Sequence, residues 1–386
     1  GEVQIKQLND RSKMYYTPNK ENNVFQLVVQ YGAGEREFPK LGYAAQLMNN
    51  AGIMGAYEPQ ELKEELSKLN ATCHVTADDD NLYIIMEGYE ATLPQACQLL
   101  SRQILMPKLD EKQLARLKGS AMGMRQQRKD NVSILNEALR QYMLYGEKSD
   151  YIKELTDKEI YELQISELTG DINRASNYEA KVFFTGTLPF DQVYDILSKN
   201  LPLVANERPS NSPQAKDMMP VTENTVYFLP NNDAEQAQIH LYIPMQKADK
   251  KDDVLRSAFN QYFGLDFTGI VLNEIREKRS MAYTAYAFVG TQGIAGKASY
   301  LRGYIGTQND KANDALDVLM GLVNDMPKNP ERIDNIKSYL RQAMLTSHPS
   351  FRNKAMELVD LGYRGYTDDP AKENLPKVDA LTFDDI

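Results

Sequence analysis

Three histidines are the side chains of this 386-residue sequence that would most readily hold a catalytic metal. None of His74, His240 and His348 has a second histidine three to five residues away, the spacing that places two imidazoles on one helix face. His240 alternates with Gln238 and Tyr242 on the polar side of a predicted strand, so we interpret it as a solvated or hydrogen-bonded residue. The spacing of the histidines therefore predicts no zinc site.

The acidic and glycine-rich segments predict no cofactor site either. Residues 78–80 are three aspartates, but they lack the glycine and the bidentate glutamate of a calcium loop, so we expect a hairpin turn. Residues 31–37, YGAGERE, lack the third glycine of a dinucleotide-binding loop and the Lys-Ser/Thr of a phosphate-binding loop. We interpret five basic residues as a solvated helix face, with a docking surface for an acidic partner as the alternative: Arg116, Lys118, Arg125, Arg128 and Lys129.

The sequence offers no activated nucleophile. It has no G-x-S-x-G motif, and neither Cys73 nor Cys97 has a histidine at the position typical of a cysteine-protease family. Cys73 and His74 are neighbours on a predicted strand, so their side chains point to opposite faces and cannot act together.

Arg276 and Tyr283 form the remaining candidate pair. They lie seven residues apart in GIVLNEIREKRSMAYTAYAFVG, with the arginine near the end of a predicted helix and the tyrosine near the start of the next strand. The pattern by itself favours a structural interpretation, in which the arginine is solvated and the tyrosine packs against the edge of a sheet.

The first half of the chain alternates strands and helices. We predict a buried strand at 24–31, two strands in LNATCHVTADDDNLYIIMEGYE and a strand in AKVFFTGTLP. The helices predicted for this half cover 39–51, 58–69, a stretch beginning near Thr92, 109–128, 131–145 and 190–200.

The same plan restarts after a polar, proline-containing segment, residues 204–223, which we interpret as a linker. Strands are predicted in QAQIHLYIPM, AYTAYAFVG and ASYLRGYIG, and EGYEATLPQACQLL matches YIGTQNDKANDALDVL about 219 residues later. The helices predicted for this half cover 251–264, 267–278, 309–322, 330–345 and 351–364.

We therefore predict an α+β protein of two tandem homologous domains, each an antiparallel-rich sheet with helices packed on one face. The first repeat covers residues 1–203, and the second covers 224–386. Judged by the length of the first repeat, the second lacks about 40 residues at its C-terminus, so we expect a piece of a longer polypeptide.

Composition excludes two broad classes of protein. The net charge of −10 is unsuited to a nucleic-acid-binding protein, which neutralises phosphates with a basic face. No apolar run reaches the roughly 18–20 residues of a membrane span. No apolar leader with a small-residue cleavage site is seen, so we expect any export signal to lie outside the given residues.

The chain resembles the insulinase/pitrilysin family of zinc metallopeptidases, specifically its half that binds no zinc. The resemblance rests on the duplicated plan, on YGAGERE followed by LGYAAQLMNNAG, and on REKRSMAY, which is similar to the R-x-K-x-x-x-A/G-Y signature of the second half of these enzymes. In the active half, the family carries an inverted zinc motif, H-x-x-E-H. Here the two histidine positions hold Ala45 and Asn49, and the general-base position holds Met48.

The third zinc ligand of the family, a glutamate, would lie near Met124 or Arg125, where no acidic residue occurs. The resemblance therefore implies that this chain binds no metal and is inactive alone, and that zinc belongs to a catalytic partner half in the same polypeptide or a separate subunit. It also implies that Arg276 and Tyr283 hold a peptide substrate near that zinc and support the transition state as the two halves close like a clam shell around a chamber.

Two alternatives remain open at this stage. In one, the chain is a catalytically inert core or scaffold subunit of a larger assembly, and Arg276 and Tyr283 are structural. In the other, it is a stand-alone peptide-binding protein. The resemblance is compatible with a periplasmic or cell-envelope location, since bacterial relatives are often exported.

Overall fold

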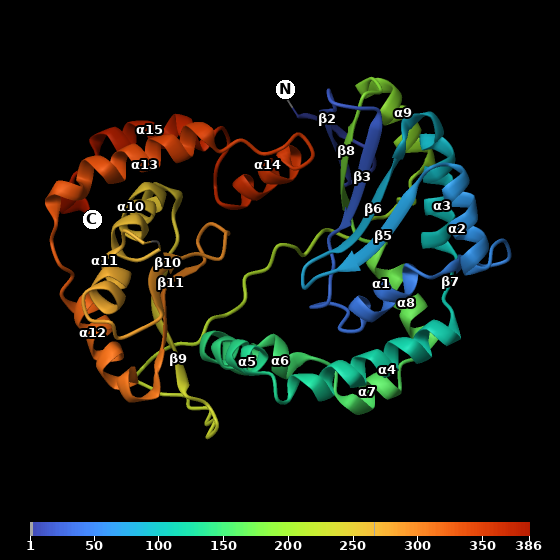
Figure 1. Ribbon diagram of the computed structural model, residues 1–386. Helices are drawn as coiled ribbons and strands as arrows, with labels where there is room; N and C mark the ends of the chain where they lie inside the picture. Colours follow the sequence, from blue (N-terminus) through green and yellow to red (C-terminus); the bar gives the residue numbers. More distant parts are fainter. Residues whose placement is uncertain (1–2, 266) are drawn as a thin grey trace. The chain divides into compact units, whose positions relative to one another are not determined.

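The computed structural model describes residues 3–265 and 267–386, which contacts divide into two compact units (Figure 1). Unit 1 consists of residues up to Lys129 together with Glu154–Gln214 and Pro349–Val359. Unit 2 consists of Asp130–Lys153, Ala215–His348 and Asp360–Ile386. Each unit therefore contains one segment that is remote in sequence from the rest of it.

The sheet of unit 1 has six strands in the order β1-β2-β8-β3-β6-β5. Neighbouring strands are antiparallel except for β2 and β8, which are parallel. The strands are β1 (Gln4–Gln7), β2 (Lys13–Pro18), β3 (Val24–Tyr31), β5 (Thr72–Ala77), β6 (Leu82–Tyr89) and β8 (Ala180–Gly186). A separate two-stranded pair joins β4 (Gly52–Ile53) to β7 (Pro107–Lys108).

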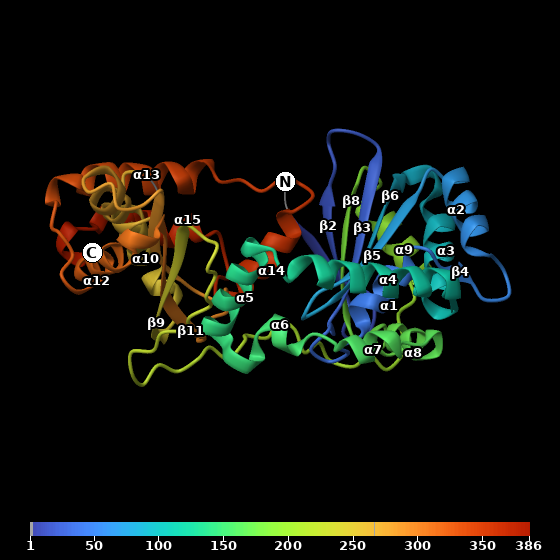
Figure 2. The ribbon, with the colours of Figure 1, turned by 60° about the horizontal axis from the view of Figure 1, so that its bottom comes forward.

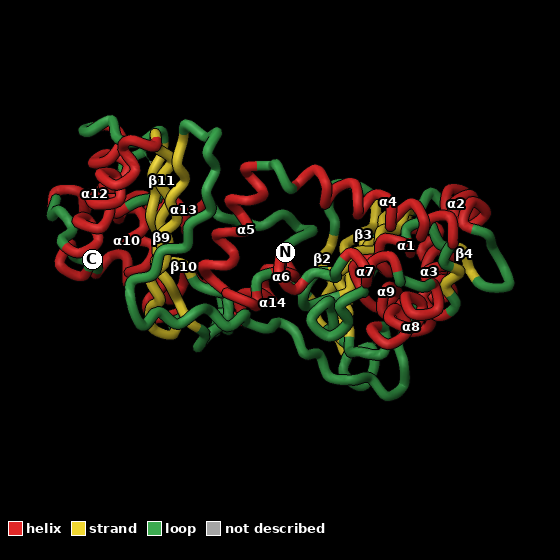
Figure 3. The backbone as a smooth tube through the Cα atoms, turned by 90° about the horizontal axis from the view of Figure 1, so that it is seen from below, coloured by secondary structure: helices red, strands yellow, loops and turns green. Residues whose placement is uncertain are grey.

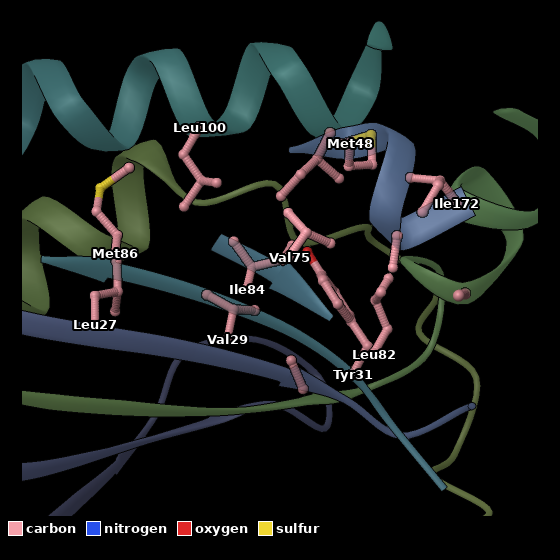
Figure 4. Close-up of a cluster of buried hydrophobic side chains, with 14 of the residues drawn as sticks. Leu27, Val29, Tyr31, Met48, Val75, Leu82, Ile84, Met86, Leu100 and Ile172 are labelled. Carbon is pink, nitrogen blue, oxygen red and sulfur yellow. The ribbon is translucent and has the colours of Figure 1, made fainter. Parts of the chain in front are cut away.

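Helices of unit 1 cover one face of this sheet (Figure 2). Burial alternates along β6, as expected for a strand that turns every second side chain toward a core. In Figure 4, the strand residues Leu27, Ile84 and Met86 meet Leu100 and Met48 from the helices. The helices are α1 (Leu41–Met48), α2 (Pro59–Lys68), α3 (Leu93–Leu105), α4 (Glu111–Arg128), α7 (Asp157–Tyr161), α8 (Ile165–Ala175) and α9 (Phe190–Asn200).

A segment from late in the sequence covers part of the opposite face. The first residues of α14 (Lys354–Tyr363) belong to unit 1, where buried Ala355 packs against Val28 of β3 and Phe183 of β8. Because side chains alternate along a strand, Val28 and Phe183 point away from the main core. The second face of the sheet therefore also carries apolar side chains, and α14 shields them from solvent.

Unit 2 is built on a three-stranded antiparallel sheet in the order β10-β11-β9. Its strands are β9 (Gln236–Lys247), β10 (Thr284–Gly290) and β11 (Ala298–Gln308). Side chains from these strands form one core with α10 (Asp253–Phe263), α11 (Ile270–Leu272), α12 (Ala312–Asn324), α13 (Ile333–Thr346) and α15 (Pro370–Ala380). Helices α5 (Val132–Tyr145) and α6 (Asp150–Lys153) also belong to this unit.

Helix α5 contacts the polar face of the unit 2 sheet. His240 of β9 lies 2.8 Å from the Asn136 Oδ1 of α5, measured from its Nε2. Burial, together with the neighbouring cations of Arg302 and Arg140, lowers the pKa of His240 to about 4. The sequence-based interpretation of a hydrogen-bonded histidine agrees with this contact.

Unit 2 is expected to lose stability as the pH falls from about 6.5 to about 4, because the unfolded chain then protonates His240 and the folded chain does not. The loss should be smaller in His240→Gln and unchanged in His348→Gln, whose side chain is exposed. Urea unfolding of the three proteins at pH 7, 5.5 and 4.5 measures this difference. Identical pH dependence of all three would contradict it.

The α+β fold class is confirmed, and most predicted elements lie where the patterns placed them. The predicted helix at 267–278 is shorter, since α11 begins at Ile270 and passes into a π-helical turn, Asn273–Glu277. Helices α6, α7, α8 and α15 and strands β1, β2, β4 and β7 are additional elements. The predicted duplication stays a prediction, although both sheets contain a three-stranded antiparallel unit of the same order, β3-β6-β5 and β9-β11-β10. Among the described residues, no helix has the length and apolar character needed to span a membrane.

Candidate functional site

Arg276 is presented to solvent by the π-helical turn Asn273–Glu277. The wider turn is closed by a hydrogen bond from the Lys278 N–H to the Asn273 carbonyl at 2.9 Å. Ile275 is fully buried in the core of unit 2, so the next residue, Arg276, faces outward with 43% of its side chain exposed. The core contact of Ile275 therefore fixes the backbone from which Arg276 projects.

A hydrogen-bonded loop then carries the chain from Arg276 to Tyr283. The Ser280 N–H donates to the Arg276 carbonyl at 2.9 Å, and Ser280 has a left-handed φ of 52°. The Tyr283 N–H donates to the Gly306 carbonyl of β11 at 2.8 Å, which attaches the end of the loop to the sheet. Both side chains thus project from backbone that is held by hydrogen bonds.

The two residues line one cavity of about 490 Å³ at the surface of unit 2. Tyr283 is 50% exposed, and the nearest charged partner of Arg276 is Glu277, whose Oε1 lies 3.7 Å from the arginine Nε. Lys311, at the start of α12, also lines this cavity and donates to the Ser280 carbonyl at 3.3 Å. A guanidinium, a phenol and an ammonium group together suit oxygen acceptors, such as peptide carbonyls or a carboxylate.

The other basic residues of the loop are engaged differently. Lys278 Nζ lies 2.7 Å and Arg279 Nη1 lies 2.6 Å from carboxylate oxygens of Glu274, and these hydrogen bonds lower the pKa of Glu274. Neither Lys278 nor Arg279 lines the cavity. Arg279 is therefore a matched control for Arg276, since it has the same side chain on the same loop.

The sequence positions that match the zinc motif lie in unit 1, on and just after α1. Ala45 and Met48 are fully buried in its hydrophobic core, where they pack among apolar side chains. No cluster of three or more histidine, cysteine, aspartate or glutamate residues that could hold a metal occurs in the described part of the chain. The side chains at these positions do not fit zinc.

Asn49, at the second histidine position, binds the backbone of the edge strand β5. Its side-chain Nδ2 donates to the Val75 carbonyl at 2.9 Å, and its Oδ1 accepts from the Val75 N–H at 2.8 Å. Asn49 and Val75 lie beside a cavity of about 650 Å³ between α2 and β5. The asparagine side chain therefore satisfies the backbone N–H and C=O of Val75 on the free edge of the sheet.

The basic residues of α4 form ion pairs within unit 1. Arg125 lies 2.6 Å from Asp157, and Arg128 lies 3.0 Å from Glu154. The position expected for a third zinc ligand thus holds a paired cation. These contacts favour a structural interpretation of the basic helix face over a docking surface.

The two cysteines are free thiols. Burial raises the pKa of Cys73 and of Cys97 to about 12, so neither forms a thiolate near neutral pH. This agrees with the sequence-based conclusion that neither is a nucleophile.

Part of the chain matches the model of a known family. Residues 176–340 match the family model described as the peptidase M16 inactive domain. No curated protein matches the sequence. The matched segment contains Arg276 and Tyr283 and ends before α14.

Solved structures of similar fold cover nearly the whole chain. The peptidase M16 inactive domain from Pseudomonas fluorescens has a TM-score of 0.73 and 18% identity, over 100% of this chain and 93% of that one. The ferredoxin protease FusC, solved in complex with Arabidopsis ferredoxin, has a TM-score of 0.76 and 13% identity over 99% of this chain. The periplasmic protease PqqL from Escherichia coli has a TM-score of 0.73 and 13% identity over 100% of this chain. This chain covers only 42% of FusC and 44% of PqqL.

Proposed function

We propose that the chain is the non-catalytic half of a two-half zinc metallopeptidase, since residues 176–340 match the peptidase M16 inactive domain, in agreement with the resemblance. In this role it positions a peptide substrate and closes the chamber over zinc held by a catalytic partner half. The coverage of FusC and PqqL supports the proposal, because each of these proteases is more than twice as long as the part that this chain matches.

The shared cavity of Arg276 and Tyr283 is the observation that carries the proposal. Arg276 can donate two parallel hydrogen bonds to backbone carbonyl oxygens of an extended peptide and so fix its position. Tyr283 can donate its phenolic hydrogen to the oxygen that becomes negative during hydrolysis, a contact that strengthens as the charge develops. Hydrogen-bonded backbone at both residues means that little reorganisation is needed when substrate arrives.

The catalytic metal must come from elsewhere in this proposal. The zinc of the partner half would activate the attacking water, whereas Ala45, Met48 and Asn49 of this chain cannot coordinate it. The substrate class we propose is an extended peptide or an unfolded protein segment. FusC, solved with ferredoxin, is an example of a similar fold in a protease bound to a protein.

The Arg276→Ala variant of the assembled enzyme is expected to lower kcat/KM at least tenfold, because the substrate loses charge-assisted hydrogen bonds. Its zinc content should not change, since no metal ligand is altered. Steady-state peptide hydrolysis and elemental analysis of the same preparations measure both quantities.

The Arg279→Ala variant is the matched control and should retain kcat/KM within about twofold, because Arg279 pairs with Glu274 outside the cavity. An unchanged kcat/KM in Arg276→Ala would contradict the proposal. It would favour the alternative in which the chain is an inert core subunit of a larger assembly.

A further inference from the structure

Lys311 brings a second cation to the cavity that Arg276 and Tyr283 line. It lies on a different element from that pair, at the start of α12, and its Nζ donates to the Ser280 carbonyl at 3.3 Å. An ammonium group has three hydrogens to donate, and a contact of this length is a weak bond for one of them. The ammonium group of Lys311 therefore has hydrogens left for an acceptor in the cavity.

Contacts on both sides of Lys311 hold its backbone at the cavity. Ala315 and Leu319 of α12 are fully buried in the core of unit 2, on the face of the sheet opposite α5 (Figure 3). Just before the helix, the Asn309 N–H donates to the Glu235 carbonyl at 3.1 Å and ties the end of β11 to the residue before β9. The start of α12 is therefore held in place before any substrate arrives.

The lining of the cavity carries more positive than negative charge. Among the described residues that line it, Glu277 alone is acidic, and its Oε1 lies 3.7 Å from the Arg276 Nε rather than beside Lys311. Glu274 is held by two basic residues outside the cavity, and Asp310 is not part of the lining. Two cations thus face one carboxylate, and this excess of positive charge attracts an anion.

We propose that Lys311 binds the carboxylate of an aspartate or glutamate side chain of the peptide substrate and gives the enzyme a preference for acidic segments. This inference rests on the proposed function, in which Arg276 holds backbone carbonyls and Tyr283 donates to the carbonyl that is cleaved. The peptide backbone then continues on both sides of the cavity. The group that reaches Lys311 is therefore a side chain and not the C-terminal carboxylate.

The two cations of the cavity suit different acceptors. The planar guanidinium of Arg276 presents a fixed pair of donors, which fits backbone oxygens at a constant position. The ammonium of Lys311 is a point charge on a flexible four-carbon chain, so it can follow a carboxylate on a shorter or a longer side chain. A hydrogen bond to a carboxylate is stronger than one to a neutral amide, so glutamate is favoured over glutamine of the same shape.

Two peptides test this binding on the 386-residue chain alone. Ala-Ala-Glu-Ala-Ala and Ala-Ala-Gln-Ala-Ala, each acetylated and amidated at its ends, differ by one charge. The methyl resonance of Met281, which lines the cavity, reports binding in a chain labelled with ¹³C at its methionine methyl groups. We expect the glutamate peptide to bind about fivefold more tightly, and this preference should shrink at high salt because exposed charges are screened.

Variants of the chain test the assignment to Lys311. Lys311→Gln should bind the two peptides equally, and Lys311→Arg should keep the preference because it keeps the charge. Lys278→Gln is the matched control and should also keep the preference, since Lys278 pairs with Glu274 outside the cavity.

Four results of these titrations would overturn the proposal. They are equal binding of the two peptides to the wild-type chain, a preference that persists in Lys311→Gln, an equal loss of preference in Lys278→Gln, and no Met281 shift with the glutamate peptide. The glutamine peptide with a free C-terminus is a further probe and should bind no more tightly than its amidated form. Tighter binding that depends on Lys311 would make a C-terminal carboxylate the ligand and would also overturn the proposal.

Kinetics of the assembled enzyme separate this inference from the proposed function. In a fluorogenic peptide that the enzyme hydrolyses, one position beside the cleaved bond is set to glutamate or to glutamine. The ratio of the two kcat/KM values should fall to about one in Lys311→Gln, whereas Arg276→Ala should lower both values. A ratio that does not depend on Lys311, with both values lowered in Arg276→Ala, would overturn the inference and leave the proposed function in place. A ratio that depends on Lys311, with full activity in Arg276→Ala, would do the reverse.

Discussion

Replacement of Tyr283 by phenylalanine in the assembled enzyme is expected to lower kcat by about 10²–10³-fold, with a smaller change in KM. Loss of one preorganised donor to a developing oxyanion typically has an effect of this size. The effect should appear mainly in kcat, because the hydrogen bond strengthens as negative charge develops. Steady-state kinetics with a fluorogenic peptide measure both constants.

The Tyr339→Phe variant is the matched control, since Tyr339 lies on α13 and is exposed to a similar degree, 52% against 50%. It should retain wild-type kinetics. A Tyr283→Phe enzyme with kcat within twofold of wild type would contradict the role of the phenol and leave Tyr283 as a residue of the sheet edge.

Replacement of Asn49 by leucine is expected to lower the free energy of unfolding of unit 1 by about 2–4 kcal/mol. The side chain has a similar size, but the Val75 N–H and C=O lose both hydrogen bonds and face methyl groups instead. Each unsatisfied buried group costs about 1–3 kcal/mol. Urea unfolding followed by circular dichroism measures the change.

Asn50→Ala is the control for this experiment, because the Asn50 side chain accepts an exposed hydrogen bond from Lys63 and does not bind β5. A change of no more than about 0.5 kcal/mol is expected there. Equal stability of Asn49→Leu and wild type would show that the bonds to Val75 make no net contribution to stability.

The local patterns predicted most of the elements, because the spacing of apolar residues within a short stretch of sequence identifies each strand or helix. β3 and β6 combine buried side chains with the alternation of a half-buried strand, and both were predicted, β6 together with the Asp-rich turn that precedes it. The π-helical turn after α11 was not predicted, since NEIRE has an ordinary helical pattern and nothing in it marks the wider hydrogen bond from Lys278 to Asn273.

The assignment of helices to units could not be predicted from periodicity. α5 and α14 follow the helices of one unit in sequence but contribute to the other, as the contacts of Asn136 and Ala355 show. An amphipathic pattern gives the apolar face of a helix and not the sheet against which that face packs.

The candidate site was predicted in part. Arg276 and Tyr283 were identified through the resemblance, and they do line one cavity. Lys311 was missed because it comes from a different element, at the start of α12. The contact of Asn49 with Val75 was missed because a bond across 26 residues leaves no local pattern.

The zinc content of the native assembly, isolated from source cells with an antibody against this chain, tests the central claim most directly. If the chain is the non-catalytic half of a zinc peptidase, the assembly contains one zinc per copy and the isolated 386-residue chain contains none. A native assembly without zinc, or stoichiometric zinc in the isolated chain, would contradict the account.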